Sequence, residues 1–355
     1  LIGYFTQNTR HIREGIRCTM ELLEGAYAMV LINGESLYAF RDPNGIRPLV
    51  LGKLPNDAGW CVASETCAFD ILGAEFVREV EPGEVLRINA EGLVSERAVA
   101  PRKKALCIFE HVYFARPDSV MDGATVQSMR VKMGEQLARE SAVEADLVIG
   151  VPDSGLPGAE GFSRASGIPC RTGFVKNRYV GRTFIQPTQE MRELGVRLKL
   201  NPLRETIEGK RVVVVDDSIV RGTTSKQIVR MLREAGATEV HMRIVSPEVK
   251  WPCFYGIDTD TQDQLISARK TPEEVCEWIG ADSLAFLSVE GLLSCVPEGG
   301  YCCSCFDGAY PVEIPAVFSQ GKFLDGYTPN NLTKASANSH RSVSDVAREI
   351  EKEYE

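Results

Sequence analysis

The sequence lacks several features that mark common protein classes. No apolar run approaches the about 20 residues of a transmembrane helix, and the densest run, Val212 to Val215, has the length of a strand. The chain starts at Leu1, with neither a start methionine nor a signal peptide. It has no G-x-x-x-x-G-K-[ST] loop and no G-x-G-x-x-G fingerprint. These absences argue against a membrane span and against the two commonest nucleotide-binding loops.

Positive charge and histidine are also scarce. The 40 Lys and Arg residues are outnumbered by 49 Asp and Glu residues, which gives a net charge of -9. This balance argues against a broad nucleic-acid or anionic-membrane surface, although it leaves room for a local basic pocket. Only four histidines are present, so a zinc site of mixed Cys and His ligands would be poorly supplied. The length of 355 residues suffices for two or three domains of ordinary globular composition.

Cysteine, by contrast, is plentiful. An odd count of 11 without a secretory signal does not suit a disulfide framework, and it favours a reducing, cytoplasmic compartment. Cys302 and Cys305 form a C-x-x-C pair, a spacing that suits one metal centre. From the residues alone a redox pair or two unrelated thiols are equally good interpretations. A cluster would need two further cysteines from distant positions.

The first 100 residues read as β-rich. Strands are expected at 25–33, 36–40 and 85–88, with a turn at Asp42-Pro43-Asn44-Gly45. Ser64 is placed to cap a short helix. The polar, basic stretch from Ala100 to Lys104 is the best candidate for a linker.

After Cys107 the pattern changes to strands that alternate with helices, which is typical of an α/β sheet. Strands are expected at 147–151, 212–215 and 239–245, and helices at 126–142, from about 158, and up to Ala235. Ser342 and Asp345 would cap a terminal helix.

The segment from Val212 to Thr224 carries the clearest chemistry. Four valines form a buried strand, and Asp216 and Asp217 follow at its end, where parallel sheets bind ligands. A glycine and hydroxyl residues then open a helix, whose backbone N–H groups make an anion cradle. Paired carboxylates beside a phosphate site can accept hydrogen bonds from sugar hydroxyls or help to hold a divalent metal. The combination indicates a sugar phosphate.

This segment resembles the phosphoribosyl pyrophosphate (PRPP) loop of type I phosphoribosyltransferases. The run Asp-Asp-Ser-Ile-Val-Arg-Gly-Thr-Thr is similar in particular to the amidophosphoribosyltransferases, the glutamine-dependent enzymes that open purine synthesis. The resemblance also covers residues 40–49, 114–119, 173–185 and 255–258, and it extends from about Gly25 to Pro315.

The resemblance implies a role for each matching residue. Asp216 and Asp217 would bind the ribose hydroxyls and, with Ser154, the Mg²⁺ region of PRPP. The 5′-phosphate would be held by Ser218, Ile219, Val220, Arg221, Gly222, Thr223 and Thr224. Asp153, Ser154 and Gly155 would form the pyrophosphate loop. Lys176, Arg178 and Tyr179 would lie on a loop that closes over PRPP, where cations neutralise the leaving pyrophosphate and closure keeps water away.

The resemblance also bears on the cysteines. One branch of the family carries a [4Fe-4S] cluster held by four cysteines, and Cys107, Cys253, Cys302 and Cys305 match that branch. Cys303 is then a neighbour and not a ligand. Such a cluster would be structural, because the transfer exchanges no electrons.

The family's glutaminase half uses a cysteine at the mature N-terminus as its nucleophile. Position 1 here is Leu1, and Cys18, Cys61 and Cys67 are internal. We therefore expect an N-terminally truncated chain with no catalytic residue in its glutaminase part and at most ammonia-dependent activity. Structural ion pairs are the default interpretation of Arg41, Asp42 and Arg47.

The expected fold is mixed α/β and α+β in three parts: a partial N-terminal-nucleophile glutaminase domain (1–100), a type I phosphoribosyltransferase domain (101–275) and an extension with the C-x-x-C pair (276–355). The expected reaction converts PRPP, glutamine and water into 5-phosphoribosylamine, glutamate and pyrophosphate. A PRPP-sensing regulator and a salvage phosphoribosyltransferase are the alternatives. The resemblance further implies purine nucleotides as feedback inhibitors and a homo-oligomer, with neither nucleic acid nor membrane as partner.

Overall fold

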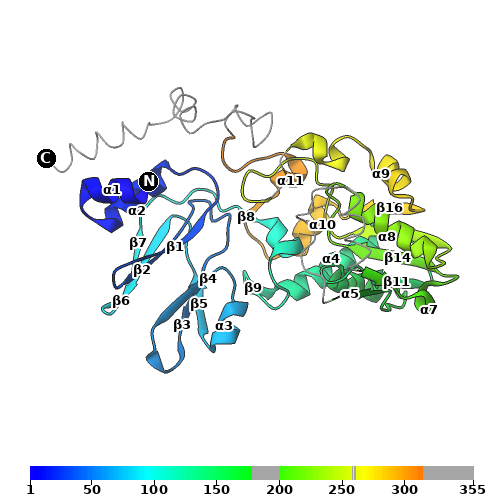
Figure 1. The fold of residues 1–355 in the computed structure, drawn as a ribbon, viewed down its shortest axis with the longest axis horizontal. Helices are drawn as coiled ribbons and strands as arrows, with labels where there is room; N and C mark the ends of the chain where they lie inside the picture. The colour runs from blue at the N-terminus through cyan, green and yellow to red at the C-terminus, as the bar shows by residue number, and fades with distance from the viewer. Residues whose placement is uncertain (178–199, 258, 260, 315–355) are drawn as a thin grey trace.

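The computed structural model describes residues 1–177, 200–257, 259 and 261–314. Antiparallel strands and two helices from the N-terminal residues lie at one end of the molecule, and a parallel sheet flanked by helices lies at the other (Figure 1). Arg178, Tyr179 and the helix expected after Ser342 lie outside the described residues.

The N-terminal residues form two antiparallel sheets. One has the order β1-β2-β6-β7, with strands at Ala28–Asn33, Ser36–Arg41, Glu84–Asn89 and Gly92–Arg97. The other has the order β4-β3-β5, with β3 at Val50–Lys53, β4 at Trp60–Ala63 and β5 at Glu75–Glu79. Helices α1 (Ile2–Thr9) and α2 (Ile12–Leu22) precede the sheets, and α3 (Cys67–Leu72) joins β4 to β5. The three expected strands are confirmed, with shifts of a few residues at their ends.

The expected turn is also confirmed, because Gly45 has a φ of 61° and donates its N–H to the Asp42 carbonyl at 3.0 Å. The helix cap at Ser64 was wrong. Thr66 stands at the cap position of α3 and makes no capping hydrogen bond. Its hydroxyl instead accepts a hydrogen bond from the N–H of Val120 at 2.8 Å. A tertiary contact therefore uses the group that the local pattern would have assigned to the helix.

The parallel sheet has the order β11-β14-β15-β16, with strands at Leu147–Gly150, Arg211–Asp216, Glu239–Ile244 and Ser283–Phe286. Val213 and Val215 of β14 belong to one buried core, and Val212 and Val214 belong to a second core on the opposite face. Both faces of the sheet are thus covered, which explains why this strand is apolar throughout.

Helices cover both faces of this sheet. They are α4 (Val126–Glu140), α5 (Gly155–Ser166), α8 (Thr223–Glu234) and α9 (Pro272–Ile279). The expected helices are confirmed, but α5 begins at Gly155, earlier than the expected start near 158. α9 contains positions 275 and 276, and β16 follows it and pairs with β15. Residues of the expected C-terminal extension therefore complete the parallel sheet.

Short elements connect the two ends of the molecule. The short strand β8 (Leu106–Cys107) pairs in parallel with β17 (Tyr301–Cys302), and a π-helix follows at Glu110–Phe114. The remaining elements are β9 (Val120–Met121), β10 (Ala124–Thr125), β12 (Phe174–Lys176), β13 (Leu200–Pro202), α7 (Arg204–Ile207), α10 (Val289–Ser294), α11 (Ser304–Asp307) and single 3₁₀ turns at Pro55–Asp57, Gln262–Gln264 and Ile266–Ala268. None of the described helices is long and apolar enough to cross a membrane.

Candidate functional site

Two aspartates lie at the carboxyl end of β14. Asp216 is the last residue of the strand, and its Oδ1 accepts a hydrogen bond from the N–H of Asp217 at 2.9 Å. Both carboxylates are buried, with exposed fractions of 7% and 9%. The Asp217 carboxylate accepts one hydrogen bond from Ser154 Oγ on Oδ2 and one from Ser218 Oγ on Oδ1, each at 2.5 Å. Ser154 precedes α5, so this bond joins the loops that follow β11 and β14.

Burial dominates the electrostatics of this pair. It raises the pKa of Asp216 well above its ordinary value, and the neighbouring charge of Asp217 raises it further. The pKa of Asp217 is also raised by burial, although the hydroxyls of Ser154 and Ser218 and the charge of Arg130 oppose the shift. Without a ligand, the two carboxylates therefore resist full ionisation. A bound cation, or hydrogen bonds from sugar hydroxyls, would stabilise their charged form.

The loop after Asp217 leads into α8. Ile219 is buried in the core, and the carbonyl of Val220 accepts a hydrogen bond from the N–H of Ile266 at 3.0 Å, so the middle of the loop is anchored. Gly222 adopts a φ of 76° at the cap position, and it makes no side-chain capping bond. The first N–H groups of α8, at Thr223 and Thr224, thus start a helix without a side-chain cap, which is the geometry of an anion site.

Two other segments carry the described residues that were predicted for the pyrophosphate side. Gly155 packs against β14 so closely that a Cβ atom there would lie 2.4 Å from the Val215 carbonyl oxygen. Lys176, at the end of β12, forms an ion pair with Asp153 of the loop before α5. The structure therefore brings Lys176 to the loop that was predicted to hold pyrophosphate, and it joins that loop to Asp217.

Arg221 points elsewhere, since its guanidinium donates hydrogen bonds to Gln264 Oε1 at 2.8 and 3.1 Å. Of the residues predicted for PRPP, the structure therefore brings together Asp216, Asp217, Ser154 and Ser218 by hydrogen bonds, and it engages the Arg221 side chain with a residue outside the loop.

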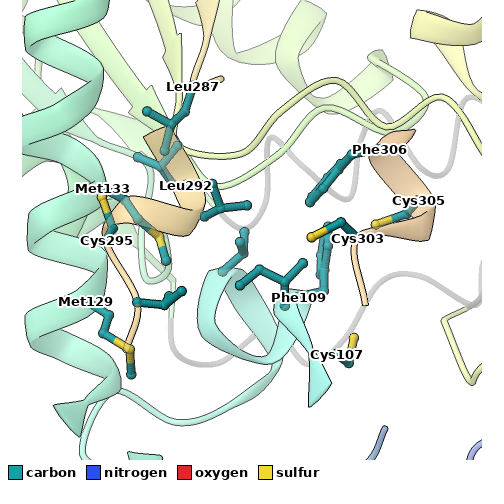
Figure 2. Packing of buried hydrophobic residues seen from close by; sticks show 14 of the residues in the cluster. Cys107, Phe109, Met129, Met133, Leu287, Leu292, Cys295, Cys303, Cys305 and Phe306 are labelled. Atoms are coloured by element: carbon teal, nitrogen blue, oxygen red, sulfur yellow. The ribbon is translucent and has the colours of Figure 1, made fainter. Parts of the chain in front are cut away.

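The four cysteines predicted as cluster ligands are also brought together. Cys107 and Cys302 are register partners of β8 and β17, and the thiol of Cys305 interacts electrostatically with those of Cys107, Cys253 and Cys302. All four are buried, and burial raises the pKa of Cys107 to about 12. Figure 2 shows Cys107 on β8 near Cys305 on α11, whereas Cys295 lies apart, beside α4.

The donor set can be compared with what a cluster needs. Among the described residues, no three His, Cys, Asp or Glu side chains are arranged around a single metal ion. A [4Fe-4S] cluster does not require that arrangement, because each of its four cysteines binds a different iron and the thiolates surround the cluster. Buried thiols from three separate segments of the chain fit such a group.

Sequence reasoning missed Arg130, which lies on α4 and is 2% exposed. Its side chain donates hydrogen bonds to the carbonyls of His111 and Ala115, both at 2.8 Å, and its charge lowers the pKa of Asp217. It therefore connects the π-helix at 110–114 with the carboxylate site. No local motif surrounds Arg130, and the periodicity of α4 marks it only as an inward-facing position.

The residues without an assigned role now have partners. Asp42 accepts hydrogen bonds from the N–H groups of Tyr27, Asn44 and Ile46, and Arg41 pairs with Glu79. These contacts lie within the N-terminal residues and suit a structural role. Arg47 differs, because its ion-pair partner at 2.6 Å is Glu110, beyond the linker.

Comparison with known proteins agrees with this geometry. The model of the phosphoribosyl transferase domain family matches residues 132–246, which include β14 and the loop after it. Amidophosphoribosyltransferases from Synechocystis sp. and Bacillus subtilis are 56% and 54% identical to this chain over 314 and 318 residues, each 88% of it. The fold is a type I phosphoribosyltransferase domain preceded by part of a glutaminase domain.

A solved structure matches this chain as well. The glutamine PRPP amidotransferase from B. subtilis, in complex with ADP and GMP, superimposes with a TM-score of 0.81 at 52% identity, and the match covers 88% of this chain and 70% of that one. The chain spans 63% and 65% of the two curated relatives. On this likeness in sequence and in fold, the chain belongs to the amidophosphoribosyltransferase family.

Proposed function

We propose that this protein transfers the 5-phosphoribosyl group of PRPP to ammonia and forms 5-phosphoribosylamine and pyrophosphate, the first step of purine synthesis. The hydrolysis of glutamine to glutamate would supply the ammonia. The observation that carries the proposal is the Ser154–Asp217 hydrogen bond beside the uncapped start of α8. It puts a hydroxyl, two carboxylates and an anion cradle at one edge of a parallel sheet, which suits a phosphorylated sugar.

Each part of PRPP has a matching group. The ribose hydroxyls would donate hydrogen bonds to Asp216 and Asp217, and the 5′-phosphate would lie against the backbone from Ser218 to Thr224. The pyrophosphate would lie between the loop at Asp153–Gly155 and Lys176, which already pair through Asp153. Arg178 and Tyr179 would join Lys176 on that side.

The reaction breaks the bond between C1 of the ribose and the pyrophosphate oxygen, and the bonding electrons leave with pyrophosphate. The nitrogen of ammonia then forms a bond to C1 and loses a proton to solvent. Lys176 would stabilise the negative charge that builds up on the leaving group. Asp216 and Asp217 would hold the ribose in place while C1 carries positive charge.

Mg²⁺ would bind at Ser154, Asp216 and Asp217 together with the oxygens of PRPP. Because Mg²⁺ in such sites takes only one or two carboxylates and completes its shell with phosphate oxygens and water, two adjacent aspartates are a suitable donor set. When bound, the ion would offset the charge of the pyrophosphate.

We also propose a structural [4Fe-4S] cluster at Cys107, Cys253, Cys302 and Cys305. The cluster would tie α11 and the segment around Cys253 to β8. Iron and acid-labile sulfide in the anaerobically purified protein, at about four atoms of each per chain, would support it. Zinc in place of iron, or no metal, would contradict it.

The wider organisation remains part of the proposal. Residues 1–100 would be the partial glutaminase domain, residues from 101 the transferase domain, and residues from 276 an extension that adds β16 to the transferase sheet and carries two cluster cysteines. The B. subtilis relative was solved with ADP and GMP, which supports purine nucleotides as inhibitors here. We also propose that the protein forms a homo-oligomer and acts in a reducing cytoplasm.

The experiment incubates the 355-residue chain with PRPP, Mg²⁺ and one of three partners: ammonium, glutamine, or a panel of free purine and pyrimidine bases. Ammonium is included because ammonia can attack C1 directly, without prior hydrolysis of glutamine. Pyrophosphate release with ammonium, and not with the bases, supports the proposal. Release only with a base would support a salvage enzyme, and PRPP binding without turnover would support a regulator.

A further inference from the structure

Arg47 joins the N-terminal residues to the segments that carry Cys107 and Cys253. It lies between β2 and β3, and its side chain is 19% exposed. Its guanidinium forms the 2.6 Å ion pair with Glu110, donates a hydrogen bond to the Tyr255 carbonyl at 3.0 Å, and lies 5.4 Å from the ring centre of Phe114. All three partners lie beyond the linker at 100–104.

Two hydrogen bonds connect the surroundings of Arg47 to cluster cysteines. The N–H of Cys107 donates a hydrogen bond to the carbonyl of Ile46, the residue before Arg47, at 3.0 Å. The N–H of Tyr255 donates to Cys253 Sγ at 3.3 Å, while the carbonyl of the same residue accepts from Arg47. One backbone unit thus contacts the guanidinium on one side and a thiol on the other.

The fit around the guanidinium is close. A Cβ atom on Gly256 would lie 2.7 Å from an Nη atom of Arg47, so a larger residue there would displace the guanidinium. Gly256 also has a φ of 111°, which L side chains rarely adopt. The segment that carries Cys253 therefore packs closely against the guanidinium of Arg47.

The charged groups around Arg47 support the same interpretation. The guanidinium of Arg47 contacts the Glu110 carboxylate and the Tyr255 carbonyl, and the preceding residue, Ile46, accepts a hydrogen bond from the N–H of Cys107. Glu110 is itself shared, since Arg130 also lowers its pKa. Arg130 also interacts with Asp217 and Glu65, so Arg47 is the cation whose own contacts lie beside the cysteine segments.

We propose that Arg47 is a positioning residue for the four-cysteine site: it supplies a buried positive charge to the cluster and thereby fixes the N-terminal sheets against the segment that holds Cys253. Four thiolates bring more negative charge than a cluster core offsets, and net charge near a cluster helps to set its reduction potential. This role rests on the cluster assigned under the proposed function. It makes cluster occupancy and the contact between the two ends of the molecule depend on each other.

The test compares the anaerobically purified full chain with Arg47→Gln, Arg47→Lys and Glu110→Gln. Arg78→Gln is the matched control, because Arg78 also pairs with a buried glutamate, Glu84, but within the N-terminal sheets. For each protein the iron content, the rate of iron release to a chelator and the reduction potential of the cluster are measured.

Arg47→Gln should release iron about tenfold faster or more, as loss of an outer-shell contact does elsewhere, and should lower the reduction potential. Glu110→Gln should raise the potential, because it removes a negative charge, and Arg47→Lys should keep it near that of the unmodified chain. A purely structural role would not move the potential in opposite directions. Arg78→Gln should change neither property.

The outcomes distinguish failure of the cluster assignment from failure of the role of Arg47. If the unmodified chain holds no iron, the cluster assignment itself is wrong. If it holds iron, but Arg47→Gln and Glu110→Gln leave the potential unchanged or shift it in the same direction, the cluster stands and the role of Arg47 is wrong. Should Arg47→Gln not fold, the direction of the shift in Glu110→Gln decides alone: upward supports the role, and unchanged or downward contradicts it.

Discussion

The hydroxyl of Ser154 donates a 2.5 Å hydrogen bond to Oδ2 of Asp217, from a residue 63 positions earlier in the chain. This contact joins the two loops at the carboxyl edge of the parallel sheet that would hold pyrophosphate and ribose. A hydrogen bond to a charged group contributes about 1.5–3 kcal/mol. The bond also fixes the orientation of the Asp217 carboxylate at the edge of the sheet.

Replacement of this hydroxyl should separate binding from stability. Ser154→Ala is expected to weaken PRPP binding roughly tenfold to hundredfold, because Asp217 loses a donor that holds it toward the ribose. Ser163→Ala, on the same helix, removes a hydroxyl bonded to the Ile168 carbonyl and should leave PRPP binding unchanged. Calorimetric titration with PRPP and Mg²⁺ measures the affinity of each variant. Equal affinities for the two variants would contradict the assignment of the loop.

Asp216→Asn is expected to stabilise the ligand-free protein and to abolish PRPP binding. Burial and the charge of Asp217 raise the pKa of Asp216 above its ordinary value of 3.8, so the folded protein favours the protonated carboxyl. The stability that this proton contributes is fully present below that value and is lost as the pH rises through the raised pKa.

At neutral pH the unsubstituted protein therefore bears a cost that asparagine removes, and the Tm of the variant should be a few degrees higher. At low pH the two proteins should converge. Thermal unfolding over a pH series measures this. A lower Tm for the variant at neutral pH would show that the charged form of Asp216 stabilises the fold.

Gly155→Ala should disturb both folding and binding. The added methyl would lie 2.4 Å from the Val215 carbonyl oxygen, so α5 must move away from β14 at a cost of about 1–3 kcal/mol. Gly3→Ala in α1 is the control, because a Cβ atom there would meet nothing within 4 Å. Denaturant unfolding should separate the two variants, and equal stabilities would contradict a tight packing of Gly155 against β14.

Lys176→Met is expected to lower the rate of pyrophosphate release roughly hundredfold, the size of a lost charge-stabilising donor. Stability should change little, because its ion pair with Asp153 is well exposed. Lys53→Met removes another exposed pair, with Asp57, far from the site. A rate for Lys176→Met that matches the rate for Lys53→Met would remove Lys176 from the leaving-group side.

Cys305→Ser should strip the protein of iron and lower its Tm, because α11 would lose its tie to β8. Cys276→Ser should do neither, since that thiol is not among the four predicted ligands and donates a hydrogen bond to the Ala281 carbonyl at 3.3 Å. Metal analysis and thermal unfolding of both variants provide the check. Full iron content in Cys305→Ser would point to a different ligand.

Much of the fold could be predicted from the sequence, because its signals are local. The four valines before Asp216 predict a buried strand, and the glycine and threonines after it predict a helix start. The turn at Asp42–Gly45 was equally readable from its residues. Where the local signal failed, tertiary contacts are present: Thr66 accepts a hydrogen bond from Val120 in place of capping its own helix, and Gly155, the first residue of α5, packs closely against β14.

Contacts between distant segments could not be predicted in this way. Nothing near Arg47 indicates that Glu110 is its partner, and nothing near Arg130 indicates that its charge reaches Asp217. Such pairs depend on how the elements pack, and a single sequence shows no periodicity for them. The four cysteines came from family resemblance, since spacing alone identified only Cys302 and Cys305.

The most direct test of the proposed reaction traces the nitrogen of ammonia into the sugar product. The 355-residue chain is incubated with PRPP, Mg²⁺ and isotopically labelled ammonium, and the sugar product is identified by mass spectrometry while pyrophosphate is measured. The account predicts one labelled 5-phosphoribosylamine for each pyrophosphate, and the loss of both in Asp216→Asn. Pyrophosphate released with unlabelled ribose 5-phosphate alone, or no release at all, would contradict it.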